Sequence, residues 1–334
     1  MTNIKYFLSY NLKMALTEKD RIILAELDRN ARSPDSEIAK KARLNKQVVN
    51  YRIKNLIKQG IINNFYTVIN VGKIGFNSHY VFLQLESVNE KEEKALLEKI
   101  KNKPYIGWLV SGTGKWDAVL LVYARSSSEF DNHLNDILAT CNNHIHEYAF
   151  ANLITAEHFG YKFLGQKNSK SISQTEKTTS TKLDETDKTI LKTISQNARL
   201  SIVNLSEKIK VPIHTIRYRL KELTKKQIIE SFKPKIEINK LGYQWHLLLI
   251  QFSAANEKRR KEFVEFCSSN KKVYYATQTI GNYNLMLDLH VHSTEDFKKT
   301  LFELKEKFSD VIKNYDSMII FDEYKIDYFT ELFS

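Results

Sequence analysis

The sequence predicts an α+β protein made of two copies of one unit, each a helix-turn-helix domain followed by a ferredoxin-like βαββαβ sandwich. An offset of 167 residues aligns residues 16–75 with residues 183–242 without a gap. The same register places Gly114 on Gly281 and Phe130 on Phe297. Each copy begins with helical periodicity and continues with alternating strand and helix patterns. One fixed offset over most of the chain indicates a tandem duplication.

Composition limits the class of protein. The chain has 334 residues, 42% of them hydrophobic, which is enough for well-packed cores in several domains. No run of eighteen apolar residues predicts a membrane span, and residues 1–15, interpreted as an N-terminal extension, lack the pattern of a signal peptide. The two cysteines, Cys141 and Cys267, stand in unrelated contexts and predict reduced thiols. We therefore expect a cytoplasmic protein without disulfides.

Three helical patterns occupy residues 16–62. The first, Thr17–Arg29, has Thr17 as its N-cap and Asp20 at the third helical position. A short pattern follows at residues 35–42. After a turn of three residues, a third helix begins behind Asn45 with apolar side chains at i, i+4 and i+7. Two short helices joined by such a turn predict a helix-turn-helix domain, and residues 183–229 repeat it.

The rest of each copy, residues 63–165 and 230–334, alternates in the order βαββαβ. In the first copy we expect strands at residues 79–87, 105–112, 116–124 and 145–154 and helices at residues 89–102 and 127–140. In the second copy we expect strands at residues 246–253, 273–280, 285–291 and 312–321 and helices at residues 256–270 and 294–308. This order predicts a ferredoxin-like sandwich. Residues 166–182, rich in Ser, Thr and Lys, are interpreted as a flexible linker.

Positive charge is concentrated in the helical segments. The net charge of the chain is +12, and residues 16–62 and 183–229 each carry +5. The two sandwich segments carry −2 and −1, the first fifteen residues +2 and the linker +3. Because neutralising phosphates supplies much of the affinity of a protein for nucleic acid, this distribution favours double-stranded DNA as the partner of the helical segments.

A set of residues in the helical segment and the middle hairpin carries a family resemblance. In the helical segment these are Asp20, Ile23-Leu24, Asn30-Ala31-Arg32, Val49, Arg52-Ile53, Leu56, Gly60 and Ile62. The hairpin has a Gly-x-x-Asp pattern at Gly114 and Asp117. The chain resembles the Lrp/AsnC (feast/famine) transcription regulators over nearly all of both copies. The resemblance implies DNA binding, dimerisation through the sandwiches and, in many members, an amino-acid effector.

The start of the third helix is where a recognition helix meets base edges. In the first copy we expect base contacts from Asn45, Lys46, Gln47 and Asn50, and phosphate contacts from Tyr51, Arg52, Lys54 and Lys58. In the second copy the base readers are Ile213, His214 and Arg217, and the phosphate contacts are Tyr218, Arg219, Lys221 and Lys225. The phosphate contacts repeat and the base readers differ. One chain is therefore expected to act as a pseudo-dimer that reads two different half-sites, with further self-association left open.

Two positions of the second copy depart from the pattern. Gln227 stands where the first copy has Gly60, so a turn with positive φ would be strained there, and the second recognition helix could end differently or bind DNA more weakly. Asn284 stands where the first copy has Asp117, which removes a charge that could hold the ammonium group of an effector. The expected effector residues are Gly114, Asp117, Gly281 and Asn284. Stabilisation of the hairpin turn is the alternative role for them.

Two other functions stay open. Siroheme decarboxylases are similar in architecture, but the corresponding regions, NKPYIGWLVSGTGKWDAV and NKKVYYATQTIGNYNLML, lack the arginine pair of that family. The other alternative is an effector-sensing module with vestigial DNA binding. Cys141, His144 and His146 are metal-ligand residue types, yet the second copy does not repeat them and no fourth ligand is evident. We therefore predict a regulator that is not an enzyme, with no catalytic residues, metal or cofactor.

Overall fold

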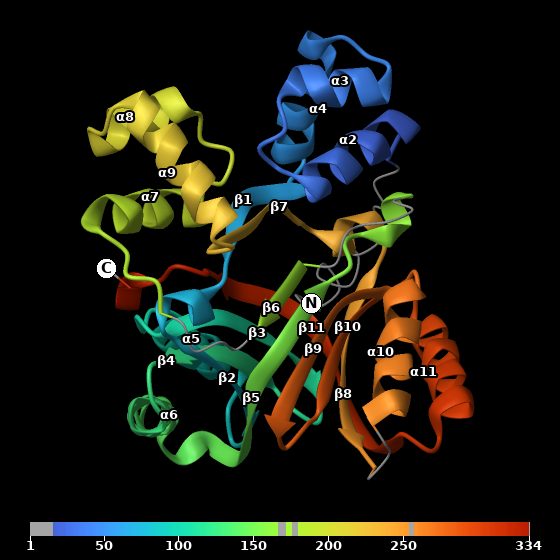
Figure 1. Ribbon diagram of the computed structural model, residues 1–334. Helices are drawn as coiled ribbons and strands as arrows, with labels where there is room; N and C mark the ends of the chain where they lie inside the picture. Colours follow the sequence, from blue (N-terminus) through green and yellow to red (C-terminus); the bar gives the residue numbers. More distant parts are fainter. Residues whose placement is uncertain (1–15, 166–171, 176–179, 254–256, 334) are drawn as a thin grey trace.

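Two helical domains stand on the same side of a strand-rich body in the computed structural model, which describes residues 16–165, 172–175, 180–253 and 257–333 (Figure 1). The first contains α2 (Glu18–Arg29), α3 (Asp35–Ala42) and α4 (Lys46–Lys58), and the second contains α7 (Glu185–Ser195), α8 (Ile202–Ile209) and α9 (Ile213–Lys225). The bounds of α4 and α9 differ by the offset of the sequence repeat, so the duplication is also structural.

Capping side chains fix the helix starts as the sequence predicts. Thr17 and Asp20 form a capping box at the start of α2. The side chain of Thr17 accepts a hydrogen bond from the N–H of Asp20, and the side chain of Asp20 accepts one from the N–H of Thr17. The side chain of Asn45 caps α4 by accepting a 2.8 Å hydrogen bond from the N–H of Val48. Between α3 and α4 the chain turns through Arg43, which has a left-handed φ of 51°. The second copy turns in the same way between α8 and α9.

Each sandwich has the predicted βαββαβ order. The first consists of β2 (Asn77–Leu85), α5 (Glu90–Lys101), β3 (Ile106–Gly114), β4 (Ala118–Ala124), α6 (Ser127–Cys141) and β5 (Ile145–His158). The second consists of β8 (Gln244–Phe252), α10 (Glu257–Ser269), β9 (Val273–Gly281), β10 (Leu285–Val291), α11 (Thr294–Phe308) and β11 (Ile312–Ile326). The strand orders are β5-β2-β4-β3 and β11-β8-β10-β9, as in a ferredoxin-like sheet.

The two sheets join into one closed barrel of eight strands. Its order is β2-β4-β3-β11-β8-β10-β9-β5, and the pairing of β5 with β2 closes it. The last strand of each copy makes both joints: the start of β5 pairs with β2 and its end with β9, whereas the start of β11 pairs with β8 and its end with β3. Closure leaves no free edge in the barrel.

A two-stranded ribbon lies between the helical domains and the barrel (Figure 1). It pairs β1 (Ile62–Ile69) of the first copy with β7 (Ile229–Ile236) of the second, antiparallel. The sequence interpretation missed both strands. It also described residues 166–182 wholly as a flexible linker, which is wrong for Ile172–Thr175, because these form strand β6 and pair with the end of β5. The first fifteen residues, and Asn256 at the expected start of the helix at 256–270, lie outside the described residues.

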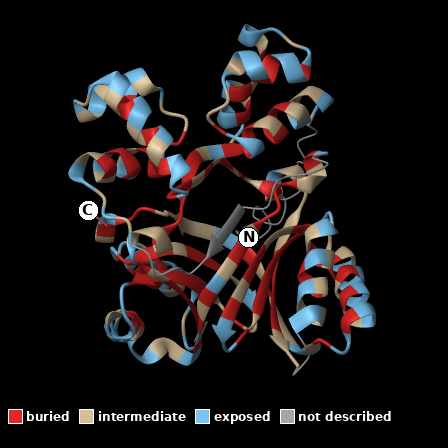
Figure 2. Cartoon of the chain, in the orientation of Figure 1, coloured by how far each residue is buried: buried red, intermediate tan, exposed pale blue. Residues whose placement is uncertain are grey.

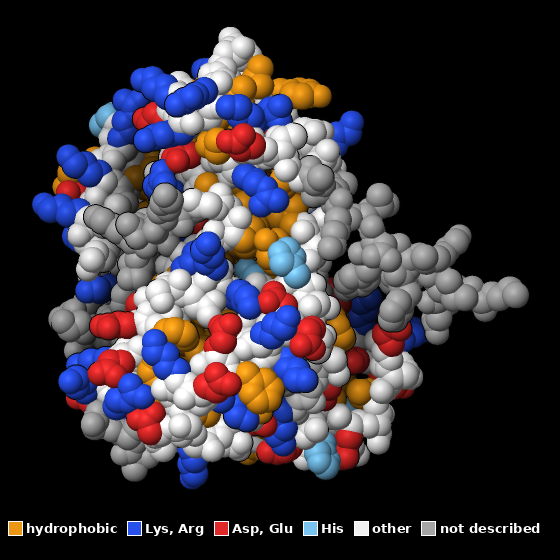
Figure 3. Space-filling view, turned by 90° about the vertical axis from the view of Figure 1, so that its right-hand side faces the viewer, with side chains coloured by type: hydrophobic (Ala, Val, Ile, Leu, Met, Phe, Trp, Pro, Cys, Tyr) orange, Lys and Arg blue, Asp and Glu red, His pale blue; other side chains and the backbone are white. Residues whose placement is uncertain are grey.

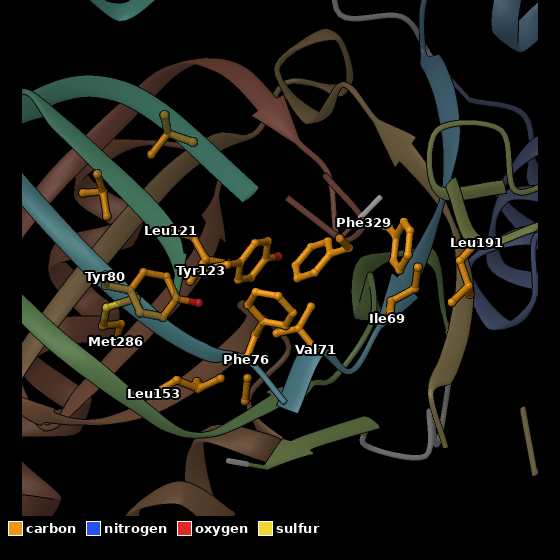
Figure 4. Close-up of a cluster of buried hydrophobic side chains, with 14 of the residues drawn as sticks. Ile69, Val71, Phe76, Tyr80, Leu121, Tyr123, Leu153, Leu191, Met286 and Phe329 are labelled. Carbon is orange, nitrogen blue, oxygen red and sulfur yellow. The ribbon is translucent and has the colours of Figure 1, made fainter. Parts of the chain in front are cut away.

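Buried residues lie where these layers meet (Figure 2), and most of them are apolar. In each copy the outer face of the sheet is covered by its two helices, and all seven residues of β4 and of β10 are buried, because these strands have a packed layer on both sides. One continuous cluster runs from Tyr80 and Met286 in the barrel to Leu191 in the second helical domain (Figure 4). None of the described helices combines the length and the apolar character needed to cross a membrane.

Candidate nucleic-acid interface

The two helical domains are tied together by a reciprocal pair of backbone hydrogen bonds. The N–H of Ala31, after α2, donates to the carbonyl of Phe232 in β7 over 2.9 Å. The N–H of Ala198, after α7, donates to the carbonyl of Phe65 in β1 over 2.9 Å. The two bonds are equivalent under the sequence offset. Each helical domain is therefore anchored on the ribbon strand that belongs to the other copy.

Arginines of the Asn-Ala-Arg motif strengthen this exchange. The guanidinium of Arg32 donates to the carbonyls of Ala198 at 2.6 Å and Leu200 at 3.0 Å. Its counterpart Arg199 donates to the carbonyls of Ala31 and Ser33. Each arginine also lies over the phenyl ring of the opposite ribbon strand, 5.4 Å from Phe232 and 5.8 Å from Phe65. The motif that carries the family resemblance is thus the contact between the copies.

The recognition helices α4 and α9 present most of the predicted contact residues to solvent. In the first copy Lys46, Gln47, Tyr51, Lys54 and Lys58 are exposed, and in the second Ile213, His214, Arg217, Tyr218, Lys221 and Lys225 are exposed. Tyr51 is 70% exposed and Tyr218 61%, which is unusual for a tyrosine that packs in its own domain. Val49, Ile53 and Leu56 are buried on the opposite face of α4. The amphipathic pattern therefore assigned the two faces correctly.

Arg52 and Arg219 differ from the other predicted phosphate contacts. The guanidinium of Arg52 donates to Asp20 at 2.9 Å and to Thr17 at 3.2 Å, which fastens α4 to the start of α2. Arg219 pairs in the same way with Asp184 at 2.7 Å, fastening α9 to α7. Both side chains are partly buried. We therefore assign them a structural role within each helical domain, and contact with phosphate through them stays a prediction.

Two of the predicted base readers are also engaged inside the domain. The side chain of Asn45 is the N-cap of α4, and the amide of Asn50 donates to the carboxylate of Asp35 over 2.9 Å. Asp35 in turn receives Arg199 of the other copy. The carboxylate of Asp35 therefore links Asn50 to Arg199, which belongs to the contact between the two copies. Lys46 and Gln47 stay the exposed polar readers at the start of α4.

Lys and Arg side chains gather at the top of the face shown in Figure 3, on the side of the first helical domain, where acidic side chains are fewer than over the sandwich below. This agrees with the +5 charge of each helical segment. No metal-binding group of three or more His, Cys, Asp or Glu occurs among the residues that the structure describes.

The turn after each recognition helix has a positive φ. The sequence predicted strain at Gln227 if its backbone took this conformation. Gly60 has a φ of 65° and Gln227 a φ of 57°. The expectation that the second helix could end differently is wrong, because α9 ends at Lys225, the aligned equivalent of Lys58 in α4. Gln227 therefore holds a left-handed conformation that disfavours a side chain, while the helix before it keeps its full length.

The Gly-x-x-Asp hairpins are bound into the barrel. A carboxylate oxygen of Asp117 accepts a 2.7 Å hydrogen bond from the N–H of Leu85 at the end of β2. The side-chain oxygen of Asn284 accepts an equivalent 2.8 Å bond from Phe252 at the end of β8. Asn thus replaces Asp without losing the acceptor.

The glycines of the same hairpins lie where strands of the two copies meet. Gly114 has a φ of 149° and pairs with Met318 of β11, and a Cβ at this glycine would collide with the carbonyl of Ser317. Gly281, with a φ of 135°, is pressed in the same way against β5. These contacts support the turn-stabilising and packing role for the four hairpin residues.

Sequence reasoning missed a cavity of about 100 Å³ between the ribbon and the barrel. Its walls are largely aromatic, and its polar side chains include His158, Lys235, Asp288, His290 and Glu323. These residues are spread over four strands, β5, β7, β10 and β11, so no single spacing in the sequence connects them.

The fold and the exposed helices define a protein with two helix-turn-helix heads carried by one closed barrel. A family profile described as "Winged helix-turn-helix DNA-binding" matches residues 16–63 and 183–230. An HTH-type transcriptional regulator of Pyrococcus furiosus is 31% identical over 122 residues, 36% of this chain and 81% of that protein. The HTH-type transcriptional regulator LrpA of Pyrococcus horikoshii is 31% identical over 116 residues, 34% of this chain and 79% of that protein. The chain belongs to the Lrp/AsnC family of HTH-type transcriptional regulators.

A likeness to solved structures extends over nearly the whole chain. One of them is the siroheme decarboxylase NirDL, with a TM-score of 0.63 and 15% identity, and the match covers 95% of this chain and 96% of that one. At this identity the likeness concerns the fold alone. The two chains thus share one overall fold along nearly their full length.

Proposed function

We propose that this chain is a transcription regulator that binds double-stranded DNA as an intramolecular pseudo-dimer, with α4 and α9 in successive major grooves. The observation that carries the proposal is the reciprocal anchoring of each helical domain on the other copy's ribbon strand. It holds two exposed, basic recognition helices on one side of the molecule. Helix-turn-helix dimers bind half-sites about one helical turn, or a multiple of it, apart.

The two heads differ where base contacts are expected. The first offers Lys46 and Gln47, and the second Ile213, His214 and Arg217. Lys and Arg pair with guanine, Gln pairs with adenine, and an apolar side chain suits the methyl group of thymine. An asymmetric site with two different half-sites therefore fits this chain better than a palindrome.

Selection of binding sites from a random DNA pool, followed by footprinting, tests the proposal. We expect one asymmetric motif and two protected regions spaced by about 10 base pairs or a multiple of that spacing. If the exposed lysines predicted to contact phosphate, Lys54, Lys58, Lys221 and Lys225, each neutralise one phosphate, log K should fall with log salt with a slope of about −4. A salt-independent affinity, or no enriched motif, would contradict the proposal.

A siroheme decarboxylase is the second candidate function, because the whole-chain fold likeness is to such an enzyme. The charges around the cavity argue against it. The lining residues include the carboxylates Asp288 and Glu323 and a single lysine, Lys235, which is already paired with Glu323 at 2.9 Å. A tetrapyrrole with many carboxylates would be repelled there. Titration of the protein with siroheme decides the matter, since bound siroheme shifts its visible absorbance.

An amino-acid effector at the hairpins stays a proposal with a defined test. Asp117→Asn removes the charge and keeps the acceptor for the N–H of Leu85, as Asn284 does for Phe252. We expect this variant to fold normally. If the carboxylate of Asp117 binds an effector ammonium group, calorimetric titration with amino acids will detect binding to the wild type and not to the variant.

A further inference from the structure

The cavity described above lies where the ribbon meets the barrel. Tyr66 of β1 and Lys235 and Ile236 of β7 close it on the side of the helical domains, and residues of all eight barrel strands form its other walls. The proposed DNA contacts on α4 and α9 do not line it. A role for this cavity is therefore independent of the proposed function.

Most of the polar side chains of the cavity come from the second copy, and His158 comes from the first. Asp288, His290, Trp245 and Lys235 line it, and the sequence offset equates them with Leu121, Tyr123, Ser78 and Val68 of the first copy. Leu121 and Tyr123 lie among apolar side chains in the continuous core (Figure 4). At the positions equivalent to Asp288 and His290, the first copy therefore packs its core with Leu121 and Tyr123. Burying a carboxyl and an imidazole there instead costs free energy, which a ligand would offset.

Two carboxylates in the cavity are each held by an indole. Trp245 Nε1 donates to Asp288 Oδ1 over 2.8 Å, and Trp108 Nε1 donates to Glu323 Oε1 over 2.7 Å. Lys235 lies 2.9 Å from Glu323 and balances its charge. Asp288, 7% exposed, has a hydrogen bond from Trp245, but no ion pair with it is found among the described residues. Asp288 is therefore the carboxyl group of this cavity that would lack a counter-ion once it is ionised.

An unpartnered imidazole also faces the cavity. His158 at the end of β5 is 5% exposed, and within the described part of the chain neither of its ring nitrogens has a hydrogen-bonding partner. Burial, with Lys233 and His290 nearby, lowers the pKa of His158 well below its usual value, so the ring is neutral and one nitrogen can accept a hydrogen bond. Burial likewise lowers the pKa of His290 to about 3. Neither histidine adds positive charge.

We propose that this cavity is a binding site for a small organic ammonium ion, with Asp288 as its counter-ion, His158 as a hydrogen-bond acceptor and the surrounding aromatic rings as its walls. Tyrosine and tryptophan faces attract cations, and carboxylates pair with them. An anion is disfavoured by two carboxylates, two neutral histidines and a lysine that is already paired. A neutral ligand leaves the charge of Asp288 unbalanced.

The size of the cavity limits the ligand. A 150 Å³ cavity in another protein holds benzene, so about 100 Å³ suits a ligand of roughly four or five non-hydrogen atoms. Isobutylammonium has this size. Isobutanol and isobutyrate share its branched chain and differ in charge, and valine adds a carboxylate to the same chain. These four compounds separate the effect of charge from the effect of shape.

Binding is measured without DNA, by titration of each compound against the full chain, with tryptophan fluorescence and calorimetry as readouts. Trp108 and Trp245, two of the three tryptophans, donate to the two carboxylates and should report occupancy. Asp288→Asn keeps the acceptor for Trp245 and removes the charge. Asp310→Asn, on the exposed end of the α11–β11 connection, is the matched control.

We expect saturable binding of isobutylammonium, at least tenfold tighter than that of isobutanol or isobutyrate, reduced at least tenfold in Asp288→Asn and unchanged in Asp310→Asn. Affinity should rise with pH, because burial raises the pKa of the Asp288 carboxyl to about 7 and the pairing form is the carboxylate. Absence of saturable binding overturns the proposal, as does equal binding of isobutanol or tighter binding of valine. If a variant fails to fold, the test still holds, because the four compounds of different charge are compared on the wild-type chain.

Discussion

The indole Nε1 of Trp116 donates a hydrogen bond of 2.8 Å to the hydroxyl of Tyr283, and the two residues occupy the same position in the two copies. Both side chains are almost completely buried in the barrel. The hydroxyl of Tyr283 in turn donates to Asp316 Oδ2 at 2.7 Å. When two equivalent positions of a repeat contact each other, the contact lies on the pseudo-two-fold axis that relates the copies. Here the two copies contribute different side chains to that contact. Two identical subunits would have to contribute the same side chain.

Tyr283→Phe should destabilise the barrel. The substitution keeps the ring and leaves the buried N–H of Trp116 without its acceptor, at a cost of about 1–3 kcal/mol. The free energy of unfolding in urea measures it. A double-mutant cycle with Trp116→Phe should give a coupling free energy of about 1 kcal/mol between the two positions, because the double variant leaves no indole N–H unsatisfied. Additive losses would show that the bond contributes nothing.

Arg32→Ala should uncouple the two heads. The guanidinium contacts two carbonyls beyond α7 and stacks on Phe232, so its loss loosens the first helical domain from the opposite ribbon strand. We expect affinity for a full DNA site to fall about tenfold while affinity for either half-site alone is unchanged. Electrophoretic mobility shifts on both kinds of DNA measure this. Arg29→Ala is the control, because its ion pair with Glu26 stays within α2.

Gln227→Gly should stabilise the second helical domain. The φ of 57° at Gln227 is left-handed, and removing a side chain from that conformation relieves about 1 kcal/mol of strain. Thermal unfolding should therefore shift upward. Gly60→Gln, the reciprocal change at a φ of 65°, should lower the stability of the first domain by a similar amount. An unchanged melting temperature in both variants would mean that neither turn is strained.

Substitutions on α9 should separate base contacts from phosphate contacts. Lys225→Ala is expected to weaken binding to all DNA sequences and to reduce the salt slope by about one. Arg217→Ala should cost about 1–3 kcal/mol on the selected site and relax the sequence preference at one base pair. Competition assays at several salt concentrations distinguish the two effects. A uniform loss for Arg217→Ala would make it a phosphate contact.

Local patterns in the sequence were enough for the element order, the caps and the two faces of α4. The final strands were predicted too short: β5 extends to His158 and β11 to Ile326, each beyond the predicted end. The added residues pair with the other copy, so their strand character depends on a partner more than a hundred residues away. The ribbon was missed for the same reason, since β7 is the one partner of β1 among the strands that the structure describes.

The candidate site was predictable to a similar degree. Exposure of the recognition helices follows from their apolar periodicity, whereas the ion pairs of Arg52 and Arg219 depend on how α4 and α9 cross α2 and α7. Arg32 was identified as part of the Asn-Ala-Arg motif. Its hydrogen bonds to the second copy could not be predicted, because they depend on how the two copies pack. The barrel cavity had no sequence signal, because His158, Lys235, Asp288, His290 and Glu323 come from four strands of both copies.

Asp288 should make the stability of the chain depend on pH. Burial raises the pKa of its carboxyl to about 7 from the 3.8 of an exposed aspartate, so between about pH 4 and 7 the folded state holds a proton that the unfolded state has released. The contribution of Asp288 to the free energy of unfolding is therefore most favourable below pH 4 and is lost as pH rises to about 7, at up to about 1.4 kcal/mol per pH unit.

Comparison with Asp288→Asn isolates this effect. The buried histidines act in the opposite direction, since the lowered pKa of His290 adds stability as pH rises through the usual histidine range. Asn cannot titrate, so the wild-type free energy of unfolding minus that of Asp288→Asn should fall steadily from pH 4.5 to pH 7 and then level off. Urea unfolding followed by tryptophan fluorescence measures the difference. The same subtraction with Asp310→Asn should stay flat, because the ion pair with Arg259 keeps the pKa of Asp310 below this range. A flat line for Asp288 as well would mean that its carboxyl is ionised in the folded protein throughout.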